Sequence, residues 1–75
     1  MAIVTARMKR VLGARVRELR KQRNWLQRDL AAACGLAASQ VGRLERGQSN
    51  ATTTTLLKIA DRFDITLTEL FRGVK

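Results

Sequence analysis

The side chains best placed for chemistry lie in one stretch of the chain, from Gln27 to Gly47. Short segments rich in alanine and leucine flank Gly35 there, and Arg43 follows in the second of them. The pattern predicts a short helix, a glycine-bearing turn and a second short helix with an arginine on its outer face. Two small-residue helices joined by a tight turn are the arrangement that presents a helix to the major groove of DNA.

Catalytic chemistry has little support in these residue types. The chain has no histidine, six acidic residues and a single cysteine, Cys34. No nucleophile–base pair can be assembled from them, and most of the carboxylates fall where they would cap helices or pair with arginines. One cysteine cannot form an intramolecular disulfide, and no paired Cys or His spacing suits a metal. We expect a non-enzymatic protein that needs no cofactor or metal, with Cys34 buried as a small apolar residue.

The net charge favours a polyanionic partner. Fifteen Lys and Arg residues against six Asp and Glu give +9. Nine of these bases lie between Arg7 and Arg28, where Glu18 is the one acid. Such a field attracts polyanions, and nucleic acid is the leading candidate for a chain of this size. A solubilising basic face is the alternative that charge alone leaves open, whereas a hydrophobic content of 45% is too high for a disordered basic tail.

The length of 75 residues predicts one small domain. A chain of this size buries only ~60% of its unfolded surface, so it needs near-ideal helix packing or a partner subunit. No apolar run approaches the ~20 residues that span a bilayer. The segment from Met1 to Arg7 lacks the charged-then-apolar order of a signal peptide. We expect a cytoplasmic protein with no membrane partner, and no small-molecule ligand is evident.

Apolar residues at steps of three and four predict an all-α domain. The expected helices run from Met8 to Arg23, from Leu26 or Gln27 to Cys34, from Ala38 to Arg46, from the threonine run at 52–55 through Phe63, and from Leu67 to Arg72. Asn24 can adopt the left-handed conformation of a helix exit. The threonines look at first like a strand, but the helical period that follows favours a helix capped by one of them. Thr66 and Glu69 form a capping box.

Five segments follow the order and spacing of the Cro/phage-repressor (Xre-type) helix-turn-helix family, which the chain resembles over residues 8 to 72. They are Leu12–Arg20, Trp25–Ala31, Leu44–Gly47, Leu56–Ala60 and Ile65–Phe71. No single segment is specific, but five in register are. The resemblance implies a compact five-helix, lambda-repressor-like domain over residues 8–75, after an extension of residues 1–7. It also implies a transcriptional regulator that binds double-stranded DNA sequence-specifically, usually as a homodimer on a palindromic operator.

The chain departs from this family at two helix caps and one loop. The family usually has Ser or Thr before Gln27, where this chain has Leu26, and Ala37 likewise precedes the third helix. A missing cap costs roughly 1 kcal/mol. We therefore expect the domain to be less stable than its relatives, or to use Asn24 and Gln27 as substitute caps. Ala51 stands where most members have a proline. That loop and the short length resemble controller proteins of restriction–modification systems, and also small phage repressors.

The third helix carries the base-reading positions that the resemblance implies. These positions are Ala38, Ser39, Gln40 and Arg43. The face opposite Val41 and Leu44 is expected to hold Ser39, Gly42, Arg43 and Arg46. Arg43 there can donate two hydrogen bonds to guanine O6 and N7. Its alternatives are a phosphate contact or a solvated position.

Phosphate contacts are expected on either side of that helix. The residues are Gln27, Arg46, Gln48, Ser49 and Asn50. Gln27 opens the second helix, where its amide and the free backbone N–H groups suit a phosphate, with simple capping as the alternative. Arg7, Lys9, Arg15 and Arg28 are further candidates, although a run of charges is more often a solvated face.

Other residues are expected to be structural. The resemblance implies that Arg20 and Glu45 form a partly buried pair that ties the first helix to the end of the third. Trp25 is expected to pack in the core between the helices. A homodimer interface is expected at the fifth helix and the chain end, which are more apolar than one short helix can bury. Its residues are Leu67, Leu70, Phe71 and Val74.

Two classes of function stay open. The first is a transcriptional regulator that acts by occupying its operator. The second is a DNA-binding antitoxin, or a basic module that binds nucleic acid without sequence choice. The ratio of affinity for a selected site to affinity for random duplex separates a regulator from a non-specific binder.

Overall fold

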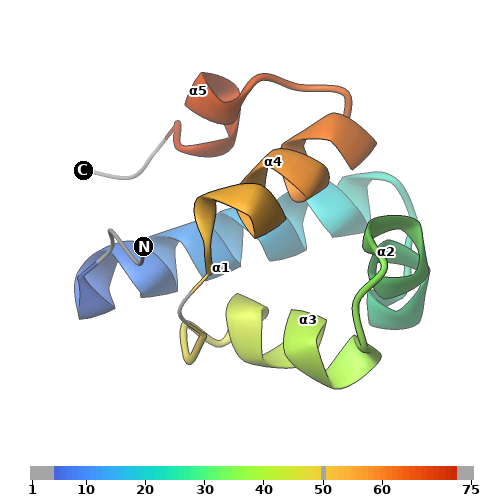
Figure 1. Ribbon diagram of the computed structural model, residues 1–75, viewed down its shortest axis with the longest axis horizontal. Helices are drawn as coiled ribbons and strands as arrows, with labels where there is room; N and C mark the ends of the chain where they lie inside the picture. The colour runs from blue at the N-terminus through green and yellow to red at the C-terminus, as the bar shows by residue number, and fades with distance from the viewer. Residues whose placement is uncertain (1–4, 50, 73–75) are drawn as a thin grey trace.

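The helices of the computed structural model follow one another with short turns, and residues 5–49 and 51–72 are described (Figure 1). They are α1 (Ala6–Gln22), α2 (Gln27–Cys34), α3 (Ala38–Glu45), α4 (Thr53–Arg62) and α5 (Leu67–Leu70). The expected all-α, five-helix class is confirmed. The first helix begins two residues before the predicted Met8, because the Thr5 hydroxyl caps it by accepting a hydrogen bond from the Met8 N–H at 3.2 Å.

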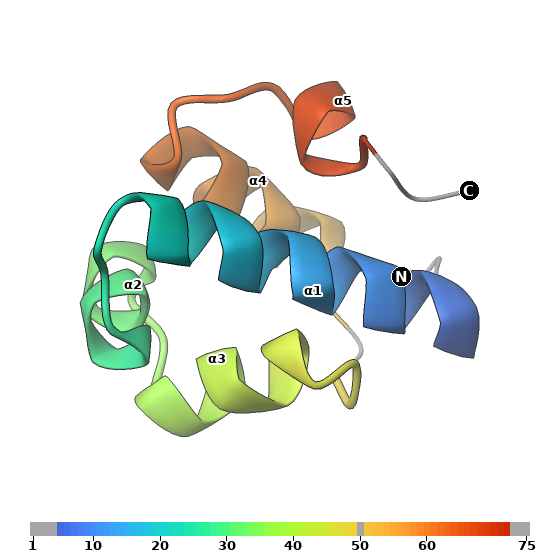
Figure 2. The ribbon, with the colours of Figure 1, turned by 180° about the vertical axis from the view of Figure 1, so that it is seen from behind.

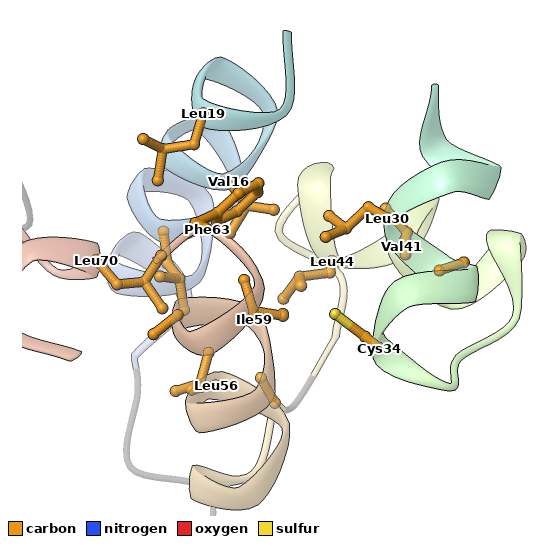
Figure 3. Close-up of a cluster of buried hydrophobic side chains, with 14 residues drawn as sticks. Val16, Leu19, Leu30, Cys34, Val41, Leu44, Leu56, Ile59, Phe63 and Leu70 are labelled. Carbon is orange, nitrogen blue, oxygen red and sulfur yellow. The ribbon is translucent and has the colours of Figure 1, made fainter. Parts of the chain in front are cut away.

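All five helices contribute side chains to one apolar core. The largest fully buried side chains are Leu12, Val16, Leu30, Val41, Leu56, Ile59, Phe63 and Leu70. Figure 3 labels all of these side chains except Leu12 and shows them gathered between the helices, with Cys34 at the side of α2. Cys34 is also buried, and burial raises the pKa of its thiol. The thiol therefore stays protonated near neutral pH and packs as a small apolar group.

Helices α1 and α4 lie at the centre of the fold, with α3 on one side of them and α5 on the other (Figures 1 and 2). Helix α3 packs against α1 and α2, while α5 packs against α4 and α1. Figures 1 and 2 place α3 and α5 on opposite sides of the molecule. Among residues 5–49 and 51–72, no helix is both long enough and apolar enough to cross a membrane.

The turn between α1 and α2 is fixed by an aromatic cluster. Asn24 has a φ of 58°, the left-handed conformation predicted for this helix exit. The next residue, Trp25, is half-buried and stacks on Phe63 with ring centroids 5.9 Å apart. The Arg23 guanidinium lies 4.7 Å from the centre of the same Phe63 ring. Trp25 thus joins the start of the helix-turn-helix unit to the end of α4.

Helices α2 and α3 compensate for their missing Ser or Thr caps in the same way. The Leu26 N–H donates to Oδ2 of Asp29 at 2.7 Å, and the Ala37 N–H donates to Oε1 of Gln40 at 2.7 Å. In each helix the side chain three residues after the cap reaches back to the cap backbone. This is the second half of a capping box, which Leu and Ala cannot complete because they have no side-chain acceptor.

The substitute caps expected from the sequence, Asn24 and Gln27, were therefore wrong for α2. Asn24 shapes the preceding turn instead, and Gln27 turns towards α3. At α4 the expected threonine cap is Thr52, whose hydroxyl accepts from the Thr55 N–H at 3.2 Å. At α5, Thr66 and Glu69 form the predicted box, and its hydrogen bonds lower the pKa of the Glu69 carboxyl.

A buried ion pair joins α1 to the end of α3. Arg20 Nε lies 2.6 Å from Oε2 of Glu45, and Arg20 Nη2 lies 3.0 Å from Oε1. Their side chains are only 9% and 3% exposed. Arg20 also donates to the carbonyl of Trp25 at 2.6 Å, and the Gln27 amide donates to Glu45 at 3.2 Å. The hydrogen bond with Glu45 is the main cause of the raised pKa of Arg20, which is charged at any ordinary pH.

Gly13 lets α1 approach α3 closely enough to form that pair. A Cβ atom at Gly13 would collide with the Leu44 carbonyl oxygen and lie 2.7 Å from the Glu45 carbonyl oxygen. The two helices therefore touch through their backbones about two turns before Arg20. Only a residue without a side chain fits this contact.

Replacing Glu45 by alanine should lower the free energy of unfolding by ~3–5 kcal/mol, because it leaves the Arg20 charge buried without its partner. Chemical denaturation followed by circular dichroism measures the change. Glu18→Ala is the matched control, since it breaks an ion pair with Arg15 whose glutamate side chain is 60% exposed. The control should cost at most about 1 kcal/mol. Equal midpoints for wild type and Glu45→Ala would show that the pair does not hold the fold.

Candidate nucleic-acid interface

One face of α3 is open to solvent and carries the expected base-reading residues. Ala38, Ser39, Gln40 and Arg43 are all exposed, whereas Val41 and Leu44 are buried. Within residues 5–49 and 51–72, the Arg43 guanidinium takes part in no ion pair. An exposed arginine without a competing carboxylate has all its donors available for a guanine edge or a phosphate.

Gly42 does not belong to this exposed face, so that part of the prediction was wrong. It is buried, and a Cβ atom there would lie 3.6 Å from Oε1 of Gln27 and 3.4 Å from a terminal nitrogen of Arg46. The start of α2 covers this side of α3. Gly42 is therefore the point where the two helices of the motif meet.

Gln27 opens α2 at this contact and is half-buried. Its amide nitrogen donates to Glu45, so the side chain bridges the two helices of the motif. The remaining amide hydrogen and the free N–H groups of the first turn of α2 are the groups that could face a phosphate. A structural bridge and a phosphate contact are compatible, because the amide has two donors.

The turn after α3 presents further polar groups beside this face. The Gln48 N–H donates to the Arg43 carbonyl at 2.9 Å, which closes the end of the helix. The exposed Arg46 lies with its Nε 3.4 Å from Oε1 of Gln48. Ser49 is half-buried and lines a hollow that also holds Gln40. Asn50, another expected phosphate contact, lies outside the described residues.

The exposed charge of this surface is positive. Arg43 and Arg46 are both exposed on α3 and its turn, and the one acid in residues 38–49, Glu45, has a side chain that is buried and paired with Arg20. Burial of the carboxylate thus leaves the outer face of α3 with unopposed arginines. Such a face suits a polyanion approaching along α3.

The residues expected at a dimer interface differ in how much surface they offer. Leu67 and Phe71 are half-buried against the core, and Val74 lies outside the described residues. Leu70 is fully buried within its own chain, so it contributes to the core and not to a surface. Among residues 5–49 and 51–72, the most exposed large apolar side chains are Leu26, at 53%, and Leu57, at 51%.

A comparison with protein-family models matches residues 16–70 to HTH_3, the helix-turn-helix family. The transcriptional regulator DdrOP3 of Deinococcus deserti is 36% identical over 61 residues, which are 81% of this chain and 47% of that protein. The regulator SutR of Escherichia coli is 38% identical over 56 residues, 75% of this chain and 32% of that protein. Both are described as HTH-type transcriptional regulators, and the chain spans about half of their length or less.

Among solved structures, the chain is similar to the restriction-modification controller protein C.AhdI from Aeromonas hydrophila. The two superpose with a TM-score of 0.80 and are 42% identical, over 83% of this chain and 94% of C.AhdI. The similarity therefore covers almost all of that controller protein.

The two glycines that lie inside α1 and α3 should respond oppositely to alanine. Gly42→Ala should raise the free energy of unfolding by up to about 1 kcal/mol, because alanine favours a helix interior and its Cβ meets only ordinary contacts at 3.4–3.8 Å. Gly13→Ala should lower it, because the Cβ would enter the α3 backbone. Thermal unfolding of the two variants compares them directly. A stabilised Gly13→Ala variant would contradict the backbone contact between α1 and α3.

Proposed function

Because the chain belongs to the HTH_3 (Xre-type) helix-turn-helix family of DNA-binding transcription regulators, we propose that it binds a specific operator and regulates transcription by occupying it. The third helix enters the major groove, and Arg43 reads a guanine through O6 and N7. Ala38 and Ser39, at the start of α3, are small enough to approach a thymine methyl or a base edge. Gln40 can still donate from its amide while its Oε1 caps α3.

The observation that carries this proposal is that α3 exposes one face to solvent while side-chain contacts hold the helix in a fixed orientation. Its four expected base-reading side chains reach solvent, while the Arg20–Glu45–Gln27 network fixes the helix against α1 and α2. Sequence-specific readout needs such a fixed frame, because base contacts discriminate only when donors meet acceptors in register. Gln27, Arg46, Gln48, Ser49 and Asn50 bind the adjoining phosphates.

A controller protein of a restriction–modification system is the biological role that we favour. The similarity to C.AhdI extends over 94% of that protein, whereas the curated regulators are matched over about half of their length or less. A small phage repressor has the same DNA-binding chemistry. A DNA-binding antitoxin is one alternative, and a basic module without sequence choice is the other; the binding assay below separates the second from a regulator.

We further propose that the protein acts as a homodimer joined on the α5 side. Leu57 is the further apolar residue that we place in this interface. Thr55 marks the side of α4 that faces α3, because it lines a hollow together with Gln40 of α3. Leu57 follows two residues later, which is about 200° further round the helix. That angle turns Leu57 away from α3, towards the side on which α5 lies (Figure 1). With Leu67 and Phe71, it gives an apolar surface on α4 and α5 that does not overlap the exposed face of α3.

A two-fold dimer of this kind predicts an inverted-repeat operator. Its half-sites should lie about one helical turn (~10 bp) apart, so that both copies of α3 enter the major groove on one side of the duplex. Selection of bound duplexes from a random DNA pool should recover such a repeat.

Arg43→Ala should weaken binding to the selected duplex by about 1–3 kcal/mol and relax the preference at one base pair per half-site. Arg46→Ala is the matched control, because it also removes one exposed arginine but is expected to lose a phosphate contact. The control should weaken selected and random duplexes by the same factor. Fluorescence anisotropy with both duplexes measures the ratio. If Arg43→Ala weakened binding to the selected and the random duplex by the same factor, Arg43 would be assigned to a phosphate contact.

Leu57→Gln should shift the free protein towards the monomer in sedimentation equilibrium at micromolar concentration. Leu26→Gln removes an equally exposed leucine at the start of α2, away from the proposed interface, and should leave the association constant unchanged. A wild-type protein that sediments as a monomer both free and on DNA would remove the dimer, and the palindrome with it. Equal effects of the two substitutions would move the interface away from α4 and α5.

A further inference from the structure

The first helix extends well beyond the part that the family model matches. The match begins at residue 16, whereas α1 begins at Ala6, so ten residues of helix, about 15 Å long, precede it. Figures 1 and 2 show this end of α1 projecting past the carboxyl end of α3. It adds surface next to the helix that faces DNA in the proposed function.

This segment is strongly basic, and its charge does not help the helix. Arg7, Lys9, Arg10 and Arg15 lie in it, and no acidic residue precedes Glu18 in the chain. The positive end of the helix dipole disfavours cations in a first turn, so helix stability does not account for Arg7 and Lys9, and Arg10 follows directly after that turn. A polyanion bound at this end would meet both the bases and the dipole with favourable sign.

Arg15 differs from the other three because its guanidinium is already used. It donates to Glu18 at 3.0 Å and to the carbonyl of Glu69 at 3.3 Å, which ties α1 to α5. Within residues 5–49 and 51–72, Arg7, Lys9 and Arg10 take part in no ion pair. Arg7 and Arg10 are exposed, and Lys9 is half-exposed.

Arg10 is fixed against the turn that follows α3. A Cβ atom at Gly47 would lie 2.9 Å from both Cα and Cγ of Arg10, and Gly47 has a φ of +75°. The base of the Arg10 side chain therefore packs directly on this turn, between Arg46 and Gln48. The end of α3 and the start of α1 thus form one continuous basic surface.

We propose that the amino-terminal turns of α1 bind DNA backbone phosphates beyond the segment that α3 reads, with Arg10 as the fixed contact and Arg7 beside it. Arg7 and Arg10 are three residues apart, so they are neighbours on the helix surface. This inference rests on the proposed DNA binding and deepens it. Phosphate contacts position a protein without reading sequence, so these first turns of α1 add affinity and lengthen the footprint without changing the recognised bases.

The salt dependence of binding by the full chain tests this contact. Arg10→Gln keeps the Cα to Cγ atoms that pack on Gly47 and removes one charge. The slope of log K against log salt should become less steep by about 0.9 per protomer. Between 50 and 200 mM salt, a variant protomer should therefore lose about 3.5-fold less affinity than wild type. Selected and random duplexes should be affected equally, and hydroxyl-radical footprints should shorten at their outer ends.

Lys58→Gln is the matched control, because it removes one exposed charge on α4, next to Cys34 and away from the α1–α3 surface. Its slope should equal that of wild type, and thermal unfolding should show both variants folded. The proposal is overturned if Arg10→Gln changes the slope no more than Lys58→Gln, or if it weakens only the selected duplex. If wild type shows no preference for any selected duplex, the sequence-specific function fails, but the slopes on random duplex still decide the role of Arg10.

Discussion

The arrangement of the motif depends on the ion pair between Arg20 and Glu45. Taking two charges out of water is costly, and the two mutual hydrogen bonds, together with those to Trp25 and Gln27, offset that cost. A pair of leucines could fill the same space, but apolar contacts would not fix the orientation of α3 relative to α1. The forked guanidinium accepts one geometry of the carboxylate, so the pair sets the rotation of α3 about its own axis. That rotation decides which side chains of α3 face solvent.

Much of this arrangement could be predicted from the sequence, because helical periodicity is a local property. Val41 and Leu44 identify the buried side of α3 from their spacing alone. Gly42 could not be placed in the same way, since it lies on the flank of α3, where the side chains of Arg46 and of Gln27 from α2 come close to it. A neighbouring helix decides such flank positions, and its approach depends on long-range packing. The caps by Asp29 and Gln40 were not predicted for a different reason: neither residue stands at the cap position, and each reaches back to it from three residues inside the helix.

The apolar residues of the chain end illustrate the same limit. A small core needs every large side chain it can bury, and Leu70 is drawn fully into it although it belongs to a helix of only four residues. The exposed large apolar side chains therefore lie elsewhere, on Leu57 of α4 and on Leu26 at the start of α2. From sequence, Leu56 and Leu57 are indistinguishable neighbours, and only the position of α5 and α3 around α4 assigns one to the core and the other to the surface.

The arginines of α1 show why net charge is a poor count of DNA contacts. Arg10, Gly13 and Arg20 lie along the side of α1 that meets α3 and its turn, yet they do different work at different depths. Arg20 is buried and paired with Glu45, so its charge is not available to a ligand at the surface. Arg15 is held by Glu18 and by a carbonyl of α5, whereas Arg10 keeps its charge at the surface while its stem is fixed on Gly47. Only charges of this last kind can release counterions from a duplex. The electrostatic part of binding therefore follows from the packing of α1 on α3, because the same close approach through Gly13 and Gly47 sets the buried pair and the exposed base together.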